Sequence, residues 1–322
     1  MNYFKLAICA AGSLAFAASA SATTVGIGST KAGAVSQITA TISKAVSQHA
    51  PGVQMRKQTM GGTQQYIPVV NAGELEFGIS NISQYYMALN GIMLSKKGGP
   101  YKNLRLVTTI MKFTVGFVVP KKLGVSKVSQ LKGKRMATGF KGAPLFVNIH
   151  NGGIATADLT AADMKSVPQV GLVNHWRAFI AGKLDFAVLA AGTGWVKQMQ
   201  AKIDGGVRHL SFPRGEESLK KMQKWFPKSE WSIVNPRKGL SSIIEPTNLV
   251  TYDFLLWTHK GMSDEVVYKV AKVMHTQEQQ LKEGGPLWRS FEANKRLAKS
   301  HGDDVPYHPA AIKYYKEVGL LK

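Results

Sequence analysis

Four segments of this sequence combine glycine with hydroxyl or lysine side chains, a composition that suits the binding of an anion. Each segment follows a predicted strand and comes before a helical pattern. The carboxyl ends of parallel strands face helix N-termini, where unpaired N–H groups and the helix dipole favour a negatively charged ligand. We therefore predict an anion site formed by Gly28-Ser29-Thr30-Lys31, Thr59-Met60-Gly61-Gly62-Thr63, Gly139-Phe140-Lys141-Gly142-Ala143 and Ala191-Gly192-Thr193-Gly194-Trp195.

The predicted ligand contacts are backbone N–H groups, hydroxyls, aromatic rings and two ammonium groups. The first half of the chain supplies Gly28, Ser29, Thr30, Lys31, Thr59, Gly61, Gly62, Thr63 and Asn81. The second half supplies Phe140, Lys141, Gly142, Ala143, Gly192, Thr193 and Trp195. Helix N-termini from both halves and a scattered positive charge favour an anion, and the four loops contain no aspartate or glutamate that would recognise an amine. We therefore expect the ligand to carry at least one carboxylate.

Each loop also has a plainer interpretation. Its glycine adopts a positive φ in an ordinary turn, and its serine or threonine caps the following helix. Lys31 and Lys141 either contact the ligand or lie in solvent, while Phe140 and Trp195 either wall its apolar part or belong to the core. The presence of four such loops, two in each half of the chain, favours the binding site.

Residues for catalysis, for a metal or for a nucleotide cofactor are not grouped in the sequence. Gly61-Gly62-Thr63 lacks the lysine of a phosphate-binding loop, and no GxGxxG motif follows a strand. His209 and His308 have no carboxylate or thiol at ligand spacing. We therefore expect no enzymatic activity, no metal and no cofactor.

Strands and helices alternate in the residues that carry these loops. Residues 25–28 read as a strand, Val35 to His49 as a helix with an apolar face, residues 53–59 and 77–80 as strands, and a short helix runs to Ala72. The pattern repeats with strands at 114–120, 135–138 and 184–189, and with helices from Pro144 and over 175–181. Alternation at this interval predicts a largely parallel sheet covered by helices.

Two similar apolar strands, at 114–119 and 249–257, are the natural crossovers between two lobes. We predict a first lobe of residues 23–116 and 253–322 and a second lobe of residues 117–252. The expected fold is α/β, with a ligand cleft between two lobes joined by two hinge strands.

The first 22 residues predict export. Lys5 precedes an apolar run over 6–18, and Ala20 and Ala22 fit a signal peptidase that cleaves after Ala22. The run is too short to span a bilayer. Cys9, the single cysteine, follows the bulky Ile8, which argues against a lipid anchor. We expect a mature periplasmic protein from Thr23 that is not lipidated.

The formal net charge is +22. Such a charge fits a nucleic acid, a membrane surface or small anions as partners. Lysines and arginines are scattered along the chain, without a basic run interleaved with aromatics or a recognition motif. We therefore expect no nucleic-acid partner, and predict a monomeric protein that attracts a small organic anion.

The loops and several later segments resemble the solute receptors of the TAXI branch of tripartite ATP-independent periplasmic (TRAP) transporters. The similar segments, in addition to the first two loops, are Gly73-Glu74-Leu75-Glu76-Phe77-Gly78-Ile79, Leu131-Lys132-Gly133-Lys134-Arg135, Ala181-Gly182-Lys183-Leu184-Asp185, Ala190-Ala191-Gly192 and Tyr307-His308-Pro309-Ala310-Ala311-Ile312-Lys313-Tyr314-Tyr315. They follow the family's order and spacing over nearly all of the mature chain. Lys31-Ala32-Gly33 and Lys141-Gly142-Ala143-Pro144 depart from its usual glycine, hydroxyl and tyrosine pattern.

The resemblance implies a two-lobed periplasmic binding protein of the type II kind that carries a carboxylate to a TRAP membrane permease driven by an ion gradient. The departures add ammonium groups, from which we predict a preference for a second negative group on the ligand. Three alternatives stay open. They are a receptor for an ATP-driven (ABC) or a tripartite tricarboxylate uptake system, a secreted two-lobed enzyme, and a host-interaction protein that uses its positive surface.

Overall fold

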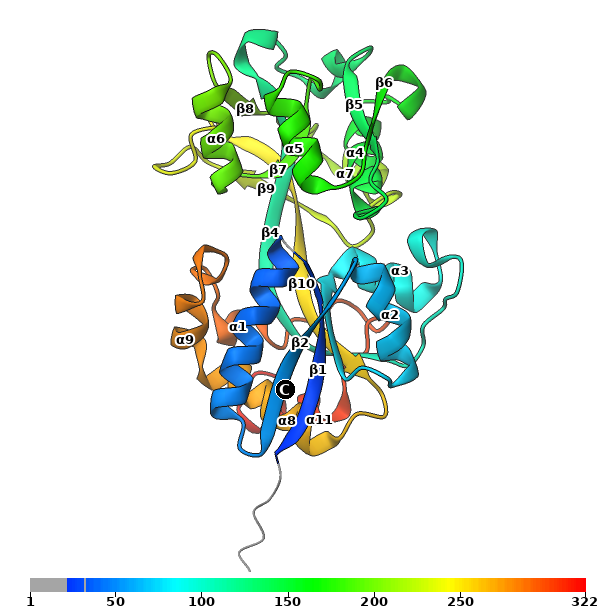
Figure 1. The fold of residues 1–322 in the computed structure, drawn as a ribbon, viewed down its shortest axis with the longest axis vertical. Helices are drawn as coiled ribbons and strands as arrows, with labels where there is room; N and C mark the ends of the chain where they lie inside the picture. Colours follow the sequence, from blue (N-terminus) through cyan, green and yellow to red (C-terminus); the bar gives the residue numbers. More distant parts are fainter. Residues whose placement is uncertain (1–21, 32) are drawn as a thin grey trace, which may run out of the picture.

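The computed structural model describes residues 22–31 and 33–322, which form two lobes joined by a narrow waist (Figure 1). The predicted leader, apart from Ala22, lies outside the described residues. In the part of the chain that the structure describes, no helix has the length and the apolar character that a membrane span requires.

The first lobe begins with three strand and helix pairs. These are β1 (Thr23–Thr30), α1 (Ala34–His49), β2 (Val53–Met60), α2 (Thr63–Ala72), β3 (Phe77–Asn81) and α3 (Ile82–Asn90). Strand β1 pairs in parallel with both β2 and β3. Helix α1 is amphipathic and buries Ile38, Ile42 and Val46, which were spaced for a helical face.

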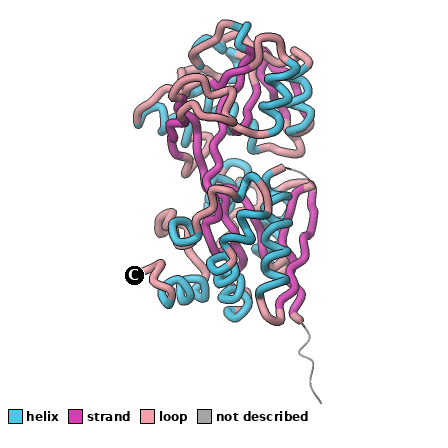
Figure 2. Tube along the Cα trace, turned by 90° about the vertical axis from the view of Figure 1, so that its left-hand side faces the viewer, coloured by secondary structure: helices cyan, strands magenta, loops and turns pink. Residues whose placement is uncertain are grey.

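Strands β4 (Leu104–Pro120) and β10 (Thr247–His259) pass through the waist and belong to both lobes. They pair antiparallel from Leu104 beside His259 to Val115 beside Val250. The main sheet has the order β2-β1-β3-β10-β4-β7, so one hydrogen-bonded sheet continues from lobe to lobe. Figure 2 shows this continuity from the side. Two linking strands are an arrangement that suits hinge motion between lobes.

The second lobe is built from shorter elements. Its strands are β5 (Arg135–Gly139), β6 (Lys165–Gln169), β7 (Ala187–Ala190), β8 (Val207–His209) and β9 (Glu230–Val234), and its helices are α4 (Leu145–Ala155), α5 (Leu172–Ile180), α6 (Gly194–Lys202) and α7 (Glu216–Gln223). A separate apolar cluster that includes Phe140, Phe179 and Met199 forms part of its core.

The chain returns to the first lobe through β10 and ends in helices α8 (Asp264–Thr276), α9 (Glu278–Glu283), α10 (Ala293–Arg296) and α11 (Pro309–Glu317). Short 3-10 helices cover Met93–Ser95, Lys121–Leu123, Val128–Leu131, Ala161–Asp163 and Pro286–Trp288. Buried residues of α8, among them Val267 and Val270, join the apolar core of the first lobe.

The observed strands extend the predicted ones where polar residues interrupt an apolar run. Strand β4 starts at Leu104, ten residues before the predicted start, because Thr108 and Thr109 are buried within it. The hydroxyl of Thr108 donates to the carbonyl oxygen of Leu297 at 3.2 Å. The predicted lobe boundaries, after residues 116 and 252, fall within β4 and β10 and stay predictions.

Candidate functional site

The first two predicted loops lie side by side at one edge of the sheet. Strands β1 and β2 are parallel and in register, with Ser29 opposite Thr59 and Thr30 opposite Met60. Each strand then turns into the N-terminus of a helix, α1 or α2. Thr59 and Lys31 are exposed at this edge. The order of elements that the sequence predicted is therefore present here.

Two of the predicted contacts in the first loop support the scaffold. The Ser29 side chain is fully buried, and its hydroxyl is 2.7 Å from the hydroxyl of Thr39 on α1. A side chain at Gly28 would place its Cβ 2.6 Å from the Tyr66 ring. Ser29 thus ties β1 to α1, and Gly28 leaves room for the Tyr66 ring of α2.

The second loop is bonded to the first turns of α2, and Asn81 caps α3. The Gly61 N–H donates to Oε1 of Gln65 at 2.7 Å, and Gly62 precedes the first residue of α2. Thr63 is buried, with its hydroxyl 3.3 Å from that of Tyr66. The Asn81 side chain accepts from the N–H of Gln84 at 2.9 Å and so caps α3. Capping is a common role for an asparagine that precedes a helix.

The third loop is fixed to the segment between β6 and α5. The N–H of Phe140 donates to the Gln169 carbonyl oxygen at 2.7 Å, and that of Gly142 to the Val170 carbonyl oxygen at 3.1 Å. Lys141, between them, is exposed. These bonds fix the loop's backbone and leave the Lys141 ammonium group free to meet an anion.

The fourth loop turns sharply at Gly192, whose φ of 79° lies in the left-handed region. The Thr193 hydroxyl donates to the carbonyl oxygen of Ala190 at 3.1 Å. The Trp195 ring packs 5.1 Å from that of Trp176 on α5, centroid to centroid. Trp195 is half-buried, so part of its ring is open at the surface of the second lobe.

Loops three and four lie at the same edge of the second lobe. The starts of β5 and β7 are joined because the N–H of Asp185 donates to the Arg135 carbonyl oxygen at 3.1 Å. Arg135 also forms an ion pair with Asp185 at 2.6 Å, which holds the pKa of the Arg135 guanidinium above its usual value. Since both strands leave this junction together, the N-termini of α4, α5 and α6 come to one edge, which we call the rim of the second lobe.

The rim meets the first lobe at two glycines. A methyl group placed on Gly62 would lie 3.5 Å from the carbonyl oxygen of Gly142. Loops two and three are therefore brought together across the lobes, with the N-termini of α2 and α4 directly behind them. Loop one lies beside loop two, and loop four lies on the same rim as loop three. The four loops thus occupy facing edges of the two lobes.

Phe140 belongs to the core rather than to an open wall. Its side chain is fully buried, and its ring lies 5.7 Å from that of Phe146 and 5.4 Å from that of His150. Its φ of 50° is in the left-handed region, which is unfavourable for a bulky residue. The core position is the alternative that the sequence left open.

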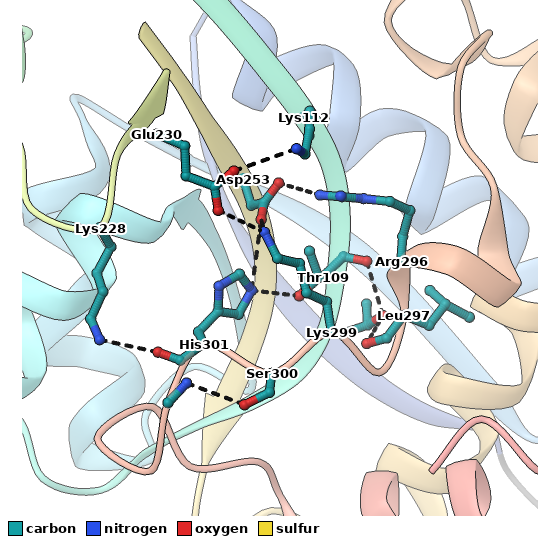
Figure 3. A network of polar contacts seen from close by, with 12 residues as sticks. Thr109, Lys112, Lys228, Glu230, Asp253, Arg296, Leu297, Lys299, Ser300 and His301 are labelled. Carbon is teal, nitrogen blue, oxygen red and sulfur yellow. Dashed lines mark hydrogen bonds and ion pairs between the residues drawn. The ribbon is translucent and has the colours of Figure 1, made fainter. Parts of the chain in front are cut away.

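A network of charges at the waist could not be read from sequence spacing (Figure 3). Asp253 of β10 is buried, pairs with Arg296 and accepts from Lys299 Nζ at 2.7 Å. Lys299 also lies 3.2 Å from Glu230 of β9, which Lys112 of β4 approaches to 3.4 Å. The sequence indicated this network only through Asp253, an acidic residue inside the apolar run 249–257.

Two buried histidines are held neutral. His301 lies beside this network, and His209 lies in the second lobe. Burial lowers the pKa of His301 to about 4, although the Asp253 carboxylate opposes the shift. Burial lowers the pKa of His209 to about 4 as well. The ring of His209 is bonded at both nitrogens, to Ser242 Oγ at 2.8 Å and to the Leu189 carbonyl oxygen at 3.1 Å. His209 is therefore a structural residue.

A surface groove of about 820 Å³ lies at the other end of the first lobe. It is lined by the end of α1 at His49, by α8 and by the start of α11. Its charges are mixed, with Asp264 and Glu265 beside Lys269 and Lys272. The groove lies one full length of α1 from loop one, so it is separate from the predicted anion site. Within residues 22–31 and 33–322, no cluster of side chains could hold a metal ion.

A family model described as the NMT1-like family matches residues 27–319. The chain belongs to the NMT1-like family. The match spans both lobes, and with them all four loops.

Solved structures confirm the predicted fold of this NMT1-like protein. PhnD1 from Prochlorococcus marinus, in complex with methylphosphonate, has a TM-score of 0.53 at 12% identity, with 92% of this chain and 99% of that chain covered. SsuA from Methylobacillus flagellatus is the periplasmic sulfonate-binding protein of a putative sulfonate ABC transporter. Its structure has a TM-score of 0.52 at 14% identity, with 92% of this chain and 95% of that chain covered. A Xanthomonas citri protein bound to ATP has a TM-score of 0.51 at 11% identity, with 92% of this chain and 96% of that chain covered. The fold is that of a type II periplasmic binding protein. Membership of the TAXI branch stays a prediction.

Proposed function

We propose that this protein is an extracytoplasmic receptor that captures a small organic anion between its two lobes and performs no chemistry on it. The observation that carries the proposal is the approach of Gly62 to Gly142 across the lobes, which brings together the loops that precede α2 and α4. Both helix ends favour a negative charge at the same place. The net charge of +22 attracts anions to the molecule as a whole.

The ligand class that we propose is a carboxylate, as the absence of acidic residues from the four loops predicts. Proteins with this fold include one in complex with methylphosphonate and a sulfonate-binding protein. Carboxylate, sulfonate and phosphonate groups share oxygens that accept hydrogen bonds from N–H groups, so all three belong in a binding test.

The motif resemblance supports delivery to a TRAP permease, and the sulfonate ABC receptor of Methylobacillus flagellatus supports the alternative of an ATP-driven importer. We propose a periplasmic location with either partner. Reconstitution with a candidate permease of either class from the same host separates the two. Uptake that follows a sodium or proton gradient without ATP supports TRAP delivery, whereas uptake that needs ATP supports the importer.

Native mass spectrometry of the mature protein from its own host tests the proposed function. A single co-purified small acid, released unchanged, is the expected result. Calorimetry then measures the affinity for acetate, pyruvate, succinate, glutamate, benzoate, methylphosphonate and an alkanesulfonate, which shows the class of anion that the protein binds. Glucose and choline are the neutral and cationic controls. Binding of a control alone, without any response to the acids, would overturn the proposal. Conversion of the acid to a product would instead favour the two-lobed enzyme.

A further inference from the structure

A chain of aromatic rings crosses the rim of the second lobe. Phe140 follows β5, His175 and Trp176 lie in α5, and Trp195 lies in the first turn of α6. The centroids of Phe140 and His175 are 5.3 Å apart, those of His175 and Trp176 are 6.5 Å apart, and those of Trp176 and Trp195 are 5.1 Å apart. The chain therefore joins loop three to loop four along the edge that faces the first lobe.

One member of this chain lacks the partners that its buried polar atoms require. The His175 side chain is fully buried, and among the described residues neither of its ring nitrogens has a hydrogen-bond partner. By contrast, His209, buried in the same lobe, is bonded at both nitrogens. A buried unbonded polar group is costly and rare in native proteins, so such a group at a predicted site calls for a function.

The neighbours of His175 define what it could recognise. His150 lies 5.3 Å away, ring centroid to ring centroid, and bonds the Phe146 carbonyl oxygen at 2.7 Å through Nδ1. Burial lowers the pKa of His175 and also that of His150, so both rings are neutral at neutral pH. A neutral imidazole offers one donor and one acceptor inside an otherwise aromatic environment.

Phe140 covers His175, and its backbone is strained. The Phe140 ring stands edge-on to that of His175, and its φ is 50°. Residues with such unfavourable backbone angles concentrate at ligand-binding sites and in switch regions. Phe140 is also two residues from Gly142, the point where the rim meets the first lobe. A ligand that shifts loop three would therefore also move the ring that packs against the imidazole.

We propose that His175 is a ligand-contacting residue, uncovered when Phe140 swings aside, and that it hydrogen-bonds an oxygen on the apolar body of the bound acid. The inference rests on the proposed function and narrows its ligand class. The acid carries its charge at the facing helix N-termini and an aromatic or branched body, with a hydroxyl or keto oxygen, against the rim. Trp176 and Trp195 pack against that body.

The test compares His175→Leu with His175→Gln and uses 4-hydroxybenzoate, benzoate, 2-oxoisovalerate and isovalerate as probes. Calorimetry on wild-type protein should show tighter binding of the oxygen-bearing member of at least one pair. His175→Leu should reduce that member's affinity about tenfold, because loss of one hydrogen bond of about 1.4 kcal/mol changes a binding constant by that factor. It should leave the other member's affinity unchanged. His175→Gln, which keeps a donor and an acceptor, should restore part of the preference.

Stability separates this role from a structural one. His175→Leu removes an unbonded polar group and should keep or raise the midpoint of urea unfolding, whereas His209→Leu, the matched control, should lower it. Equal affinity of wild type and His175→Leu for every probe overturns the inference, as does a wild type without preference within either pair. An affinity loss that His175→Gln does not restore also overturns it. If no probe and no acid of the earlier panel binds wild type, the proposed function itself fails.

Discussion

Single side chains decide what the loops can do. Ser29, Gly28 and Asn81 were predicted as ligand contacts from residue type and position, but Ser29 bonds Thr39 and Asn81 caps α3. The sequence could indicate that a loop follows a strand. It could not show which hydroxyl a neighbouring helix would engage, because Thr39 is ten residues away and its contact depends on how α1 packs.

Lys141 is the exposed residue of the rim whose charge can be tested directly. It lies in loop three between Phe140 and Gly142, beside the approach to Gly62. Lys141→Ala should weaken binding of succinate or another dianion by about tenfold to a hundredfold and that of a monocarboxylate less, as for loss of a charged hydrogen bond. Calorimetry at low salt measures the change. Equal dianion affinities in the two proteins would place the ammonium group in solvent.

The buried neutral histidines predict a stability that depends on pH. Burial lowers the pKa of His150 and of His209 to about 4. Between pH 4 and the ordinary value near 6.5 the unfolded chain therefore binds more protons than the folded one. The free energy of unfolding should fall as pH decreases through this window, by up to about 1.4 kcal/mol per pH unit for each histidine.

Urea unfolding at pH 7.5, 6 and 5 measures this slope. His209→Gln keeps a neutral polar side chain and should make the slope shallower than in wild type. A wild-type stability that stays constant between pH 7.5 and 5, or that rises on acidification, would show that these rings are not held neutral.

At the scale of elements, the two strands through the waist determine the architecture. Their apolar runs were visible in the sequence, as was the strand and helix alternation on either side, so the fold could be predicted. The full length of β4 could not, because Thr108 and Thr109 read as polar while their side chains are buried in the core. Strand β6 was missed because its residues are largely exposed or half-buried and include Pro168.

Asp253 is expected to stabilise the waist strongly. Its carboxylate is 5% exposed and lies between Arg296 and Lys299. Asp253→Asn would leave Arg296, itself largely buried, without its opposite charge, and should lower the free energy of unfolding by about 3 to 5 kcal/mol. Chemical denaturation measures the loss.

Glu230→Gln is the matched control, because Glu230 contacts the same Lys299 but is 49% exposed. Its effect should stay within about 1 kcal/mol, as for other exposed ion pairs. Similar losses for the two variants would mean that burial of Asp253 does not set the strength of this network.

At the scale of the whole molecule, the facing edges of the two lobes meet at a pair of glycines, one from each lobe. The sequence indicated that glycine-rich loops from both halves would converge, and the structure brings loop two to loop three at Gly62 and Gly142. It could not indicate the rings behind them, because Phe140, His175 and Trp195 are far apart in the chain. A net charge of +22, spread over both lobes, adds long-range attraction for anions but does not choose among them.

The most direct test of capture between the lobes is the affinity of Gly62→Trp for the anion that wild type binds most tightly in calorimetry. Gly62 has a φ of 176°, an extended conformation open to any residue, so a tryptophan there places its side chain against Gly142 without backbone strain. The account predicts one binding site in wild type, at least a hundredfold weaker binding in Gly62→Trp, and unchanged urea unfolding. Equal affinity in a normally folded Gly62→Trp protein would contradict it.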